Sequence, residues 1–304
     1  MRPIRLSIIF LMIVMISPWC WISFDTRAQQ QDQSRGLHVK KIEESRPNSN
    51  TPVDPNQPRT YRSTSSTALS SDLRKSSSAS EAVIGVTLWR LRAVKATDNQ
   101  GARILEHKNS KNVEWTAQRI EADAQLNEGD RIRLGIESPS TGYLYVIDRE
   151  QYADGSLGDP YLIFPTTHTR GGDNSVTGGR VIEFPAQEDE PPYFVLTRSR
   201  AEHVGERLVI IVAPKPLDGI QPGPEPIKVS SDKLSAWEKD WTGTTEQFEL
   251  EGGGGMPYSN AEKVAGGPGS RMLTQKDPLP QTIFRVSAKL GSPVLIRLVL
   301  RIAR

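Results

Sequence analysis

Short runs of apolar residues, each bounded by turn-forming residues, fill the chain from about residue 83 onward. They are rich in Val, Ile, Leu and aromatic residues, and they read VIGVTLWRLRAV, VEWTAQRIEADA, DRIRLGIES, GYLYVIDRE, PYLIFP, GRVIEFP, YFVLT and RLVIIVAP. Clusters of Gly, Asp, Asn, Ser and Pro lie between them and are typical of turns. The pattern predicts an all-β fold, an antiparallel β-sandwich or a partly open barrel.

One of these runs alternates strictly between apolar and other residues. Ile132, Leu134 and Ile136 fall on one face, while Arg131 and Arg133 fall on the other. Successive side chains of a strand point to opposite faces of its sheet, so this run predicts a sheet with a core side and a wet side.

A single short helix is expected in the second half of the chain. Ser231 and Asp232 can cap the run KLSAWEKDW, in which Leu234, Trp237 and Trp241 recur at helical spacing. The three apolar residues therefore predict a stripe that packs against the sheet.

The residue pattern of the C-terminal region predicts a loop followed by a hairpin. Residues from about 251 to 280 are rich in Gly and Pro, which favours a flexible loop. The chain then ends with IFRVSAKL and VLIRLVLRIAR, separated by Gly291, Ser292 and Pro293. We expect these two runs to pair and complete the sheet.

The N-terminus carries the pattern of a signal peptide over residues 1–28. Arg2 and Arg5 precede the apolar run LSIIFLMIVMISPWCWISF, and Thr26 and Ala28 are small residues at a cleavage site after Ala28. The pattern predicts a periplasmic or secreted protein. The alternative is an uncleaved membrane anchor, because the apolar run is nearly long enough to span a bilayer.

The sole cysteine of the chain, Cys20, lies within this segment. Trp19 stands where a lipobox requires a small residue, which disfavours a lipid anchor. The mature chain therefore has no cysteine, and this excludes disulfides, thiol nucleophiles and Cys-ligated zinc. The exported domain has to be held together by an ordinary hydrophobic core.

Composition indicates a polar appendage on one compact domain. Residues 29–80 are rich in Ser, Pro and Gln and show no apolar periodicity, so we expect a disordered linker that leaves 81–304 as the β-sandwich domain. The 38 basic and 36 acidic residues are interspersed along the chain. No field strong enough to bind nucleic acid is implied.

The stretch from Trp89 to about Pro216 contains WTAQRIEADAQLNEGDRIRLGIESPSTGYLYVIDRE, LIFP, VIEFPA and ERLVIIVAP. With these features it resembles the bacterial domain of unknown function 4384 family. The resemblance implies an exported or surface-associated β-rich accessory domain, which other proteins attach to peptidase or kinase modules. It implies no catalytic residues.

Four carboxylates raise the question of a metal site between two strand runs. Asp148, Glu150, Asp154 and Asp159 could supply the oxygen ligands that calcium prefers. Their spacing departs from that of an EF-hand, and a basic residue lies among them. The favoured interpretation is a turn at Asp154 and Gly155 with the carboxylates in solvent, and calcium is the alternative.

The sequence offers little for catalysis. Ser156 lies in the run DGSLG, which approaches a nucleophile elbow, but His107, His168 and His203 have no recognisable base motif around them. No zinc-binding histidine pair is present. Gly residues at 252–255 lack the Lys and Ser or Thr of a phosphate-binding loop. We therefore expect no enzymatic activity and no cofactor.

Aromatic residues carry the remaining binding hypothesis. Tyr143, Tyr145, Tyr152 and Tyr161 cluster in the sequence, and tyrosine is used to recognise glycans and peptides. Packing in the core or across strands is the favoured alternative. A ligand face here would fit an envelope protein or a glycan.

These observations predict an exported, non-catalytic binding or interaction module of the bacterial cell envelope. The alternatives are an envelope hydrolase with an unrecognised site and a calcium-stabilised structural domain. A pocket in which a histidine, a carboxylate and a hydroxyl converge would favour the hydrolase. A flat aromatic face or an open sheet edge would favour the binding module.

Overall fold

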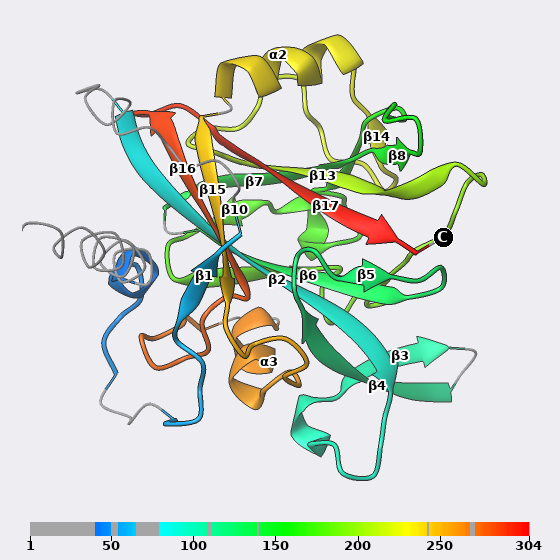
Figure 1. The fold of residues 1–304 in the computed structure, drawn as a ribbon, viewed down its shortest axis with the longest axis vertical. Helices are drawn as coiled ribbons and strands as arrows, with labels where there is room; N and C mark the ends of the chain where they lie inside the picture. Colours follow the sequence, from blue (N-terminus) through cyan, green and yellow to red (C-terminus); the bar gives the residue numbers. More distant parts are fainter. Residues whose placement is uncertain are drawn as a thin grey trace, which may run out of the picture.

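The computed structural model describes residues 40–49, 54–64, 79–108, 111–138, 140–241, 243–267 and 271–303. Two β-sheets pack face to face, so the fold is the all-β sandwich that the apolar pattern predicts (Figure 1). The expected signal peptide and its cleavage site lie outside the described residues. No helix in the described ranges is long and apolar enough to cross a membrane.

The first sheet is organised around one long central strand, β2. Its first part pairs with β16, its second part pairs with β4 on the same edge, and β6 occupies the opposite edge. The strands of this sheet are β1 (Tyr61–Ser63), β2 (Ala79–Ala93), β3 (Ile104–Lys108), β4 (Lys111–Ile120), β6 (Arg131–Ser138), β11 (Arg180–Phe184), β12 (Phe194–Val195), β15 (Thr244–Leu250) and β16 (Thr282–Lys289).

The second sheet is built around β13, which pairs with β7 and β8 on one edge and with β17 on the other. All of its described pairings are antiparallel except the short pairing of β5 with β17. Its strands are β5 (Gln125–Leu126), β7 (Gly142–Asp148), β8 (Glu150–Tyr152), β9 (Tyr161–Phe164), β10 (Ser175–Val176), β13 (His203–Ala213), β14 (Ile227–Lys228) and β17 (Val294–Ile302).

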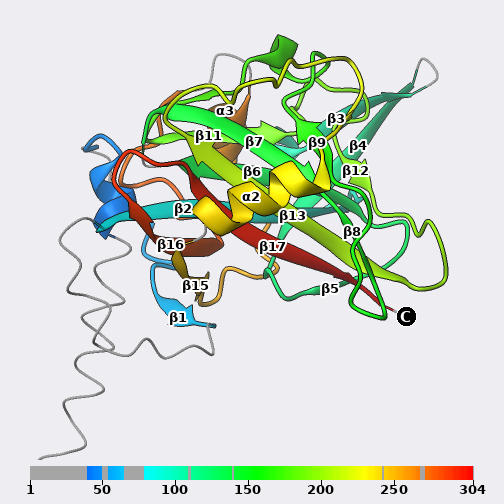
Figure 2. The same cartoon turned by 90° about the horizontal axis from the view of Figure 1, so that it is seen from above.

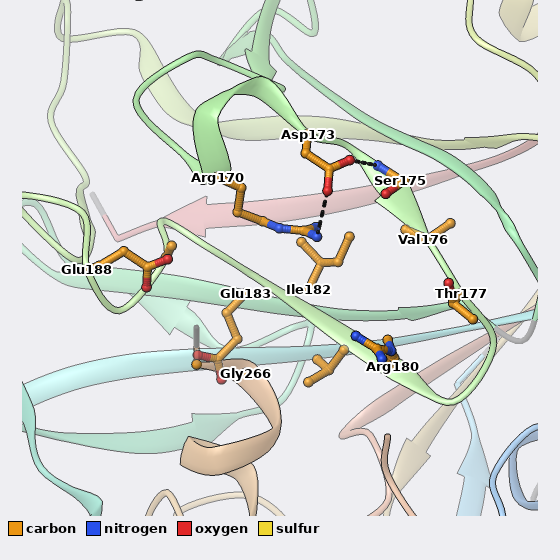
Figure 3. A pocket seen from close by; sticks show the side chains of 13 residues that line it. Arg170, Asp173, Ser175, Val176, Thr177, Arg180, Ile182, Glu183, Glu188 and Gly266 are labelled. Atoms are coloured by element: carbon orange, nitrogen blue, oxygen red, sulfur yellow. Dashed lines mark hydrogen bonds and ion pairs between the residues drawn. The ribbon is translucent and has the colours of Figure 1, made fainter. Parts of the chain in front are cut away.

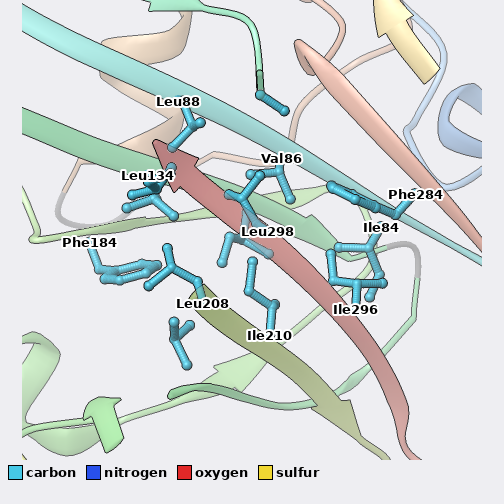
Figure 4. Packing of buried hydrophobic residues seen from close by; sticks show 14 of the residues in the cluster. Ile84, Val86, Leu88, Leu134, Phe184, Leu208, Ile210, Phe284, Ile296 and Leu298 are labelled. Atoms are coloured by element: carbon cyan, nitrogen blue, oxygen red, sulfur yellow. The ribbon is translucent and has the colours of Figure 1, made fainter. Parts of the chain in front are cut away.

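The main hydrophobic core lies between the two sheets (Figure 4). Ile84 and Leu134 reach into it from the first sheet, and Leu208, Ile210 and Leu298 reach into it from the second. Every second residue of β6, β13 and β17 contributes, as the alternation of a half-buried strand requires.

The alternation predicted in β6 is confirmed on its core side and wrong on its other side. Ile132, Leu134 and Ile136 are buried in the core between the sheets. Arg133, however, is only 1% exposed and pairs with Glu183 at 2.9 Å. The outer face of the first sheet is covered here, so a charged residue on it marks a buried ion pair rather than a wet surface.

The predicted helix is confirmed as α2 (Ser231–Trp241), which lies across the outer face of the second sheet (Figure 2). Leu234 is fully buried, and Trp237 and Trp241 pack with it against the sheet. The predicted cap is displaced by one residue, because the Lys233 amide donates to the Ser230 hydroxyl. Strands of the second sheet supply most of this outer cluster, and the connection between β13 and α2 adds Leu217, Ile220, Ile227 and Val229.

The expected flexible loop at 251–280 is wrong for the parts of it that the structure describes. It contains a second helix, α3 (Asn260–Gly266), which begins with a reciprocal capping box between Ser259 and Glu262. Arg119 pairs with Glu262 and ties the helix to β4. Gly residues on both sides of the helix hide its short pattern. Two single-turn 3₁₀ helices are also described, η2 (Gln100–Ala102) and η3 (Arg170–Gly172).

The predicted C-terminal hairpin is also wrong. β16 pairs with β15 and β2 in the first sheet, whereas β17 pairs with β13 and β5 in the second. The turn between them, with Gly291 at a φ of 74°, carries the chain from one sheet to the other. Both strands have an apolar face toward the shared core, and this pattern alone does not say whether they pair or oppose each other.

Two segments of the expected disordered linker, 40–49 and 54–64, are folded against the first sheet, and the second of them supplies its edge strand β1. Residues 40–44 are helical, and β1 pairs with β15. Ile42 and Tyr61 are almost completely buried in a cluster with Val83, Phe248 and Ile283. The prediction of disorder is wrong for these segments, because two isolated apolar side chains in a polar stretch give no periodic signal. The remaining linker residues up to 78 lie outside the described residues.

Candidate functional site

The stretch after β7 turns the chain, as predicted. The Gly155 amide donates to the Tyr152 carbonyl at 2.9 Å, and the Tyr152 amide donates to the Ser156 carbonyl at 3.0 Å. Asp154 caps the turn, since its Oδ1 accepts hydrogen bonds from the Ser156 amide and hydroxyl. Gly155 has a φ of 83°, a left-handed conformation that favours glycine.

Replacing Gly155 with valine is expected to destabilise the protein by about 1–2 kcal/mol, the cost of a left-handed conformation for a residue with a Cβ. No atom lies within 4 Å of the added Cβ, so backbone strain is the sole penalty. Gly223→Val is the matched control, because Gly223 also has open space around it but no positive φ. Urea unfolding measures both variants, and equal losses would contradict the assignment.

The four carboxylates considered as alternative calcium ligands do not all converge. Asp154 caps its own turn, and Asp159 pairs with the exposed Lys228 on β14. Glu150 accepts a hydrogen bond from the Tyr152 hydroxyl. Within the described ranges, no group of three or more His, Cys, Asp or Glu side chains is arranged to hold a metal ion.

Asp148 instead meets Glu206, a residue of β13 that the sequence did not single out. The two carboxyl groups lie within hydrogen-bonding reach of each other. Burial raises the pKa of Asp148 to about 7, and burial with the neighbouring Asp148 and Glu150 raises the pKa of Glu206 to about 9. The pair therefore holds a shared proton at neutral pH.

The Ser156 hydroxyl and the histidines contact different groups. His203 is completely buried, and its Nδ1 accepts from the Ser199 amide. Its Nε2 lies 2.9 Å from the Gly205 carbonyl and 3.2 Å from Glu206 Oε1, so His203 contacts the Asp148–Glu206 pair. His107 bonds to Asn112. The Ser156 hydroxyl donates to Asp154 rather than to a histidine.

The four tyrosines proposed as a ligand face do not share one exposed face. Tyr145 is 3% exposed, and its hydroxyl accepts from the Leu217 amide. Tyr143 packs into the same cluster beneath α2. Tyr152 lies under the Arg200 guanidinium, and Tyr161 alone is well exposed, at 42%. The alternative, cross-strand and core packing, describes Tyr143 and Tyr145.

A site that the sequence did not predict lies where the chain passes from the second sheet to the first. β10 pairs with β7 in the second sheet, and β11 pairs with β6 in the first. The turn between them closes with a hydrogen bond from the Arg180 amide to the Thr177 carbonyl, and Gly179 adopts a φ of 75°. The two strands diverge from this turn and leave a space between the sheet edges.

This space is a cavity of about 420 Å³ (Figure 3). η3 and β10 form one wall, β11 forms the floor, and the end of α3 closes one side. The lining residues are Arg170, Asp173, Ser175, Val176, Thr177, Arg180, Val181, Ile182, Glu183, Ala186, Glu188, Gly266 and Gly267. We refer to it as the β11 cavity. Its size is that of a site for a small ligand.

The β11 cavity contains one cation and one carboxylate that have no ion-pair partner among the described residues. Arg170 pairs with Asp173 at 3.3 Å, so these two side chains largely neutralise each other. Arg180 and Glu188 are exposed, and neither forms an ion pair with another described residue. They lie on opposite sides of the cavity (Figure 3).

The third acidic residue of the cavity, Glu183, belongs to its wall. It is 4% exposed and accepts hydrogen bonds from Arg133, Tyr258 and Gln187. Burial raises the pKa of Glu183 above its ordinary value. Gly266 packs directly against this carboxyl, where any Cβ would collide with it. The network fixes α3 against β11 and gives the cavity a rigid side.

The floor of the β11 cavity is an open sheet edge. β11 pairs with β6 on one side and with no described strand on the other. Such an edge presents unpaired backbone N–H and C=O groups, to which an extended chain can add.

Searches against protein-family models, curated proteins and solved structures found no match to this chain. The resemblance to the domain of unknown function 4384 family stays a prediction, and the function has to be argued from the geometry of the site.

Proposed function

We propose that this protein is a non-catalytic binding module of the bacterial cell envelope, and that it holds a short extended peptide with free ends in the β11 cavity. The observation that carries the proposal is the open edge of β11 with an unpaired cation and an unpaired carboxylate on opposite sides. Export to the envelope rests on the N-terminal pattern of residues 1–28.

The open edge accounts for the peptide backbone. An added strand hydrogen-bonds to the main chain of the edge, which gives affinity without requiring a particular sequence. β11 has five residues. A tetrapeptide spans about 13 Å when extended, at about 3.3 Å per residue, and thus matches most of the strand.

The two charges account for the free ends. The guanidinium of Arg180 suits a terminal carboxylate, for which arginine has a planar pair of donors. The carboxylate of Glu188 suits a terminal ammonium group. A peptide that binds in this way fills both charged positions at once and has a fixed direction along β11.

Binding rather than catalysis is favoured by the lining. The cavity offers the hydroxyls of Ser175 and Thr177, but none of the residues that line it is a histidine. A hydrolase would need a base beside one of these hydroxyls.

Unblocked tetra-alanine is expected to bind the protein more tightly, by about fivefold or more, than the same peptide with acetylated and amidated ends, because the ends supply two ionic contacts. Isothermal titration calorimetry measures both affinities. In Arg180→Gln, a peptide with a free C-terminal carboxylate should bind no more tightly than the same peptide with an amidated C-terminus. Arg301→Gln is the matched control, since Arg301 is an equally exposed arginine that does not line the cavity.

Two results would count against the proposal. Equal affinity for the free and the blocked peptide would remove the role of the charges. Equal binding by Arg180→Gln and Arg301→Gln would place the peptide elsewhere on the surface.

A further inference from the structure

A second cavity, of about 650 Å³, lies on the other side of the 184–191 segment. Its floor is apolar and is formed by Ile163, Phe184, Pro185, Pro191, Tyr193, Phe194, Val195, Pro224 and Pro226. Thr166, His168 and Thr169 add polar groups on one side. We refer to it as the proline groove. Phe184 stacks on Phe164 beneath it and contacts Phe194 edge to face, so the floor is backed by packed aromatic rings.

The rim of the proline groove is acidic. Glu188, Glu190 and Glu225 are exposed, and none of them forms an ion pair with another described residue. Asp189 is different, because it accepts hydrogen bonds from the Thr169 hydroxyl and the Ala186 amide. No lysine or arginine is among the residues that line the groove. Three carboxylates thus face one apolar hollow without a balancing cation.

One wall of the groove is a short open strand. β12 pairs with β6 and with no other described strand, and its Val195 is 45% exposed. An exposed β-branched side chain beside an open edge gives a docked segment both an apolar contact and main-chain partners.

We propose that the proline groove docks a segment of a partner protein in which lysine or arginine alternates with large apolar side chains. The apolar side chains of the segment fill the floor, where desolvated contacts supply most of the affinity of an interface. Its cations face Glu190 and Glu225 on the rim, which selects the sign of charge and speeds association. The groove shares only Glu188 with the β11 cavity, and this proposal does not depend on the peptide ligand proposed there.

The test uses a fluorescein-labelled, end-capped heptapeptide that alternates lysine with phenylalanine and leucine. Capped ends prevent the contacts proposed for the β11 cavity. Fluorescence anisotropy in low salt should show saturable binding, and the counterpart with glutamate in place of lysine should not bind. Replacing both rim residues (Glu190→Gln with Glu225→Gln) should weaken binding by about tenfold, as two weakly interacting exposed charges predict.

The matched control removes two exposed carboxylates that do not line the groove, Glu202 and Glu251, as Glu202→Gln with Glu251→Gln. This variant should bind like the unaltered protein. Thermal melting of both variants checks that they are folded. Glu188 is left intact because it lines both cavities.

Three outcomes would overturn the proposal: equal binding of the glutamate peptide, displacement of the lysine peptide by spermidine at equal positive charge, or equal affinity in the two double variants. The first removes the charge selection, the second removes the apolar contribution, and the third places the peptide outside the groove. Unblocked tetra-alanine should not compete, and competition by it would mean that both peptides occupy the β11 cavity.

Discussion

Replacing Arg46 with alanine is expected to destabilise the protein by about 3–5 kcal/mol, the range for breaking a buried ion pair on one side. The Arg46 Nε and Nη2 atoms donate to the two carboxylate oxygens of Glu137, each at 2.7 Å. The side chains of Arg46 and Glu137 are 0% and 3% exposed. Loss of the guanidinium leaves a buried carboxylate without a partner.

The same guanidinium also joins three parts of the chain. Its remaining N–H groups donate to the carbonyls of Thr274, Asp277 and Pro278, while Glu137 belongs to β6. The segment at 40–49 is thus attached to the sheet and to the 274–278 loop through one side chain. The variant is expected to loosen both segments together.

Arg62→Ala is the matched control, because Arg62 pairs with Glu121 at a surface where the two side chains are 46% and 34% exposed. An exposed pair contributes at most about 1 kcal/mol. Urea unfolding gives the free energy for each variant. A loss for Arg46→Ala no larger than that for Arg62→Ala would show that the N-terminal segment does not contribute to stability.

A second variant separates the buried charge from the contacts that surround it. Arg46→Met combined with Glu137→Leu removes both charges and keeps apolar volume, so it is expected to lose less stability than Arg46→Ala alone. A larger loss in the double variant would instead mean that the carbonyl contacts of Arg46 dominate.

The protein is expected to lose stability as the pH rises from about 5 to about 9, and Glu206→Gln is expected to remove much of this loss. The pKa values of Asp148 and Glu206 are raised on folding, to about 7 and about 9. The folded protein therefore binds more protons than the unfolded chain in this range. Stability contributed by such groups is complete at low pH and is lost as the pH passes the folded pKa values.

The expected loss is several kcal/mol, because each proton held by the folded state alone changes the free energy of unfolding by about 1.4 kcal/mol per pH unit. Glutamine in place of Glu206 can still donate a hydrogen bond to Asp148 and does not ionise. The variant should therefore be more stable than the unaltered protein at about pH 9.

The comparison removes the pair while most other titrating groups are unchanged, although His203, whose Nε2 lies 3.2 Å from Glu206 Oε1, loses a charged neighbour. Asp98 and Asp277 have lowered pKa values, so they stay ionised throughout this range. Glu183 and Glu249 have raised pKa values but are present in both proteins. Glu202→Gln, which removes an exposed carboxylate, is the control. Parallel pH profiles for Glu206→Gln and the unaltered protein would refute the shared proton.

The same profiles test the calcium alternative. If a cation takes the place of the shared proton, calcium should raise the melting temperature at about pH 9 and should have no effect on Glu206→Gln. We expect calcium to leave the melting temperature unchanged in both.

Local patterns in the sequence were sufficient for most of the long strands, the turn and one helix, but not for β1, β3 or β15. The alternation at Ile132, Leu134 and Ile136 identified the core face of β6, because neighbouring side chains of a strand must point to opposite sides. Gly155 marked the turn, since glycine tolerates a positive φ that other residues avoid. These properties depend on adjacent residues and are visible in any short window.

The burial of polar and isolated residues was decided by tertiary structure. Arg133 sits on the face predicted to be wet, but α3 and Tyr258 cover that face and supply Glu183 with partners. Ile42 lies in a polar stretch that gives no periodic signal, and it is buried because β1 and β15 bring a matching apolar surface to it.

The candidate sites likewise could not be predicted from the sequence. The residues of the β11 cavity lie in turns and at the end of a helix, and they meet because the chain changes sheets between β10 and β11. Glu206 reaches Asp148 because β13 pairs with both β7 and β8. The sequence by itself determined most of the long strands and which way their side chains face. The choice of partner strand, and hence which charged groups meet, was made by the packing of two sheets, since an apolar face fits either of them.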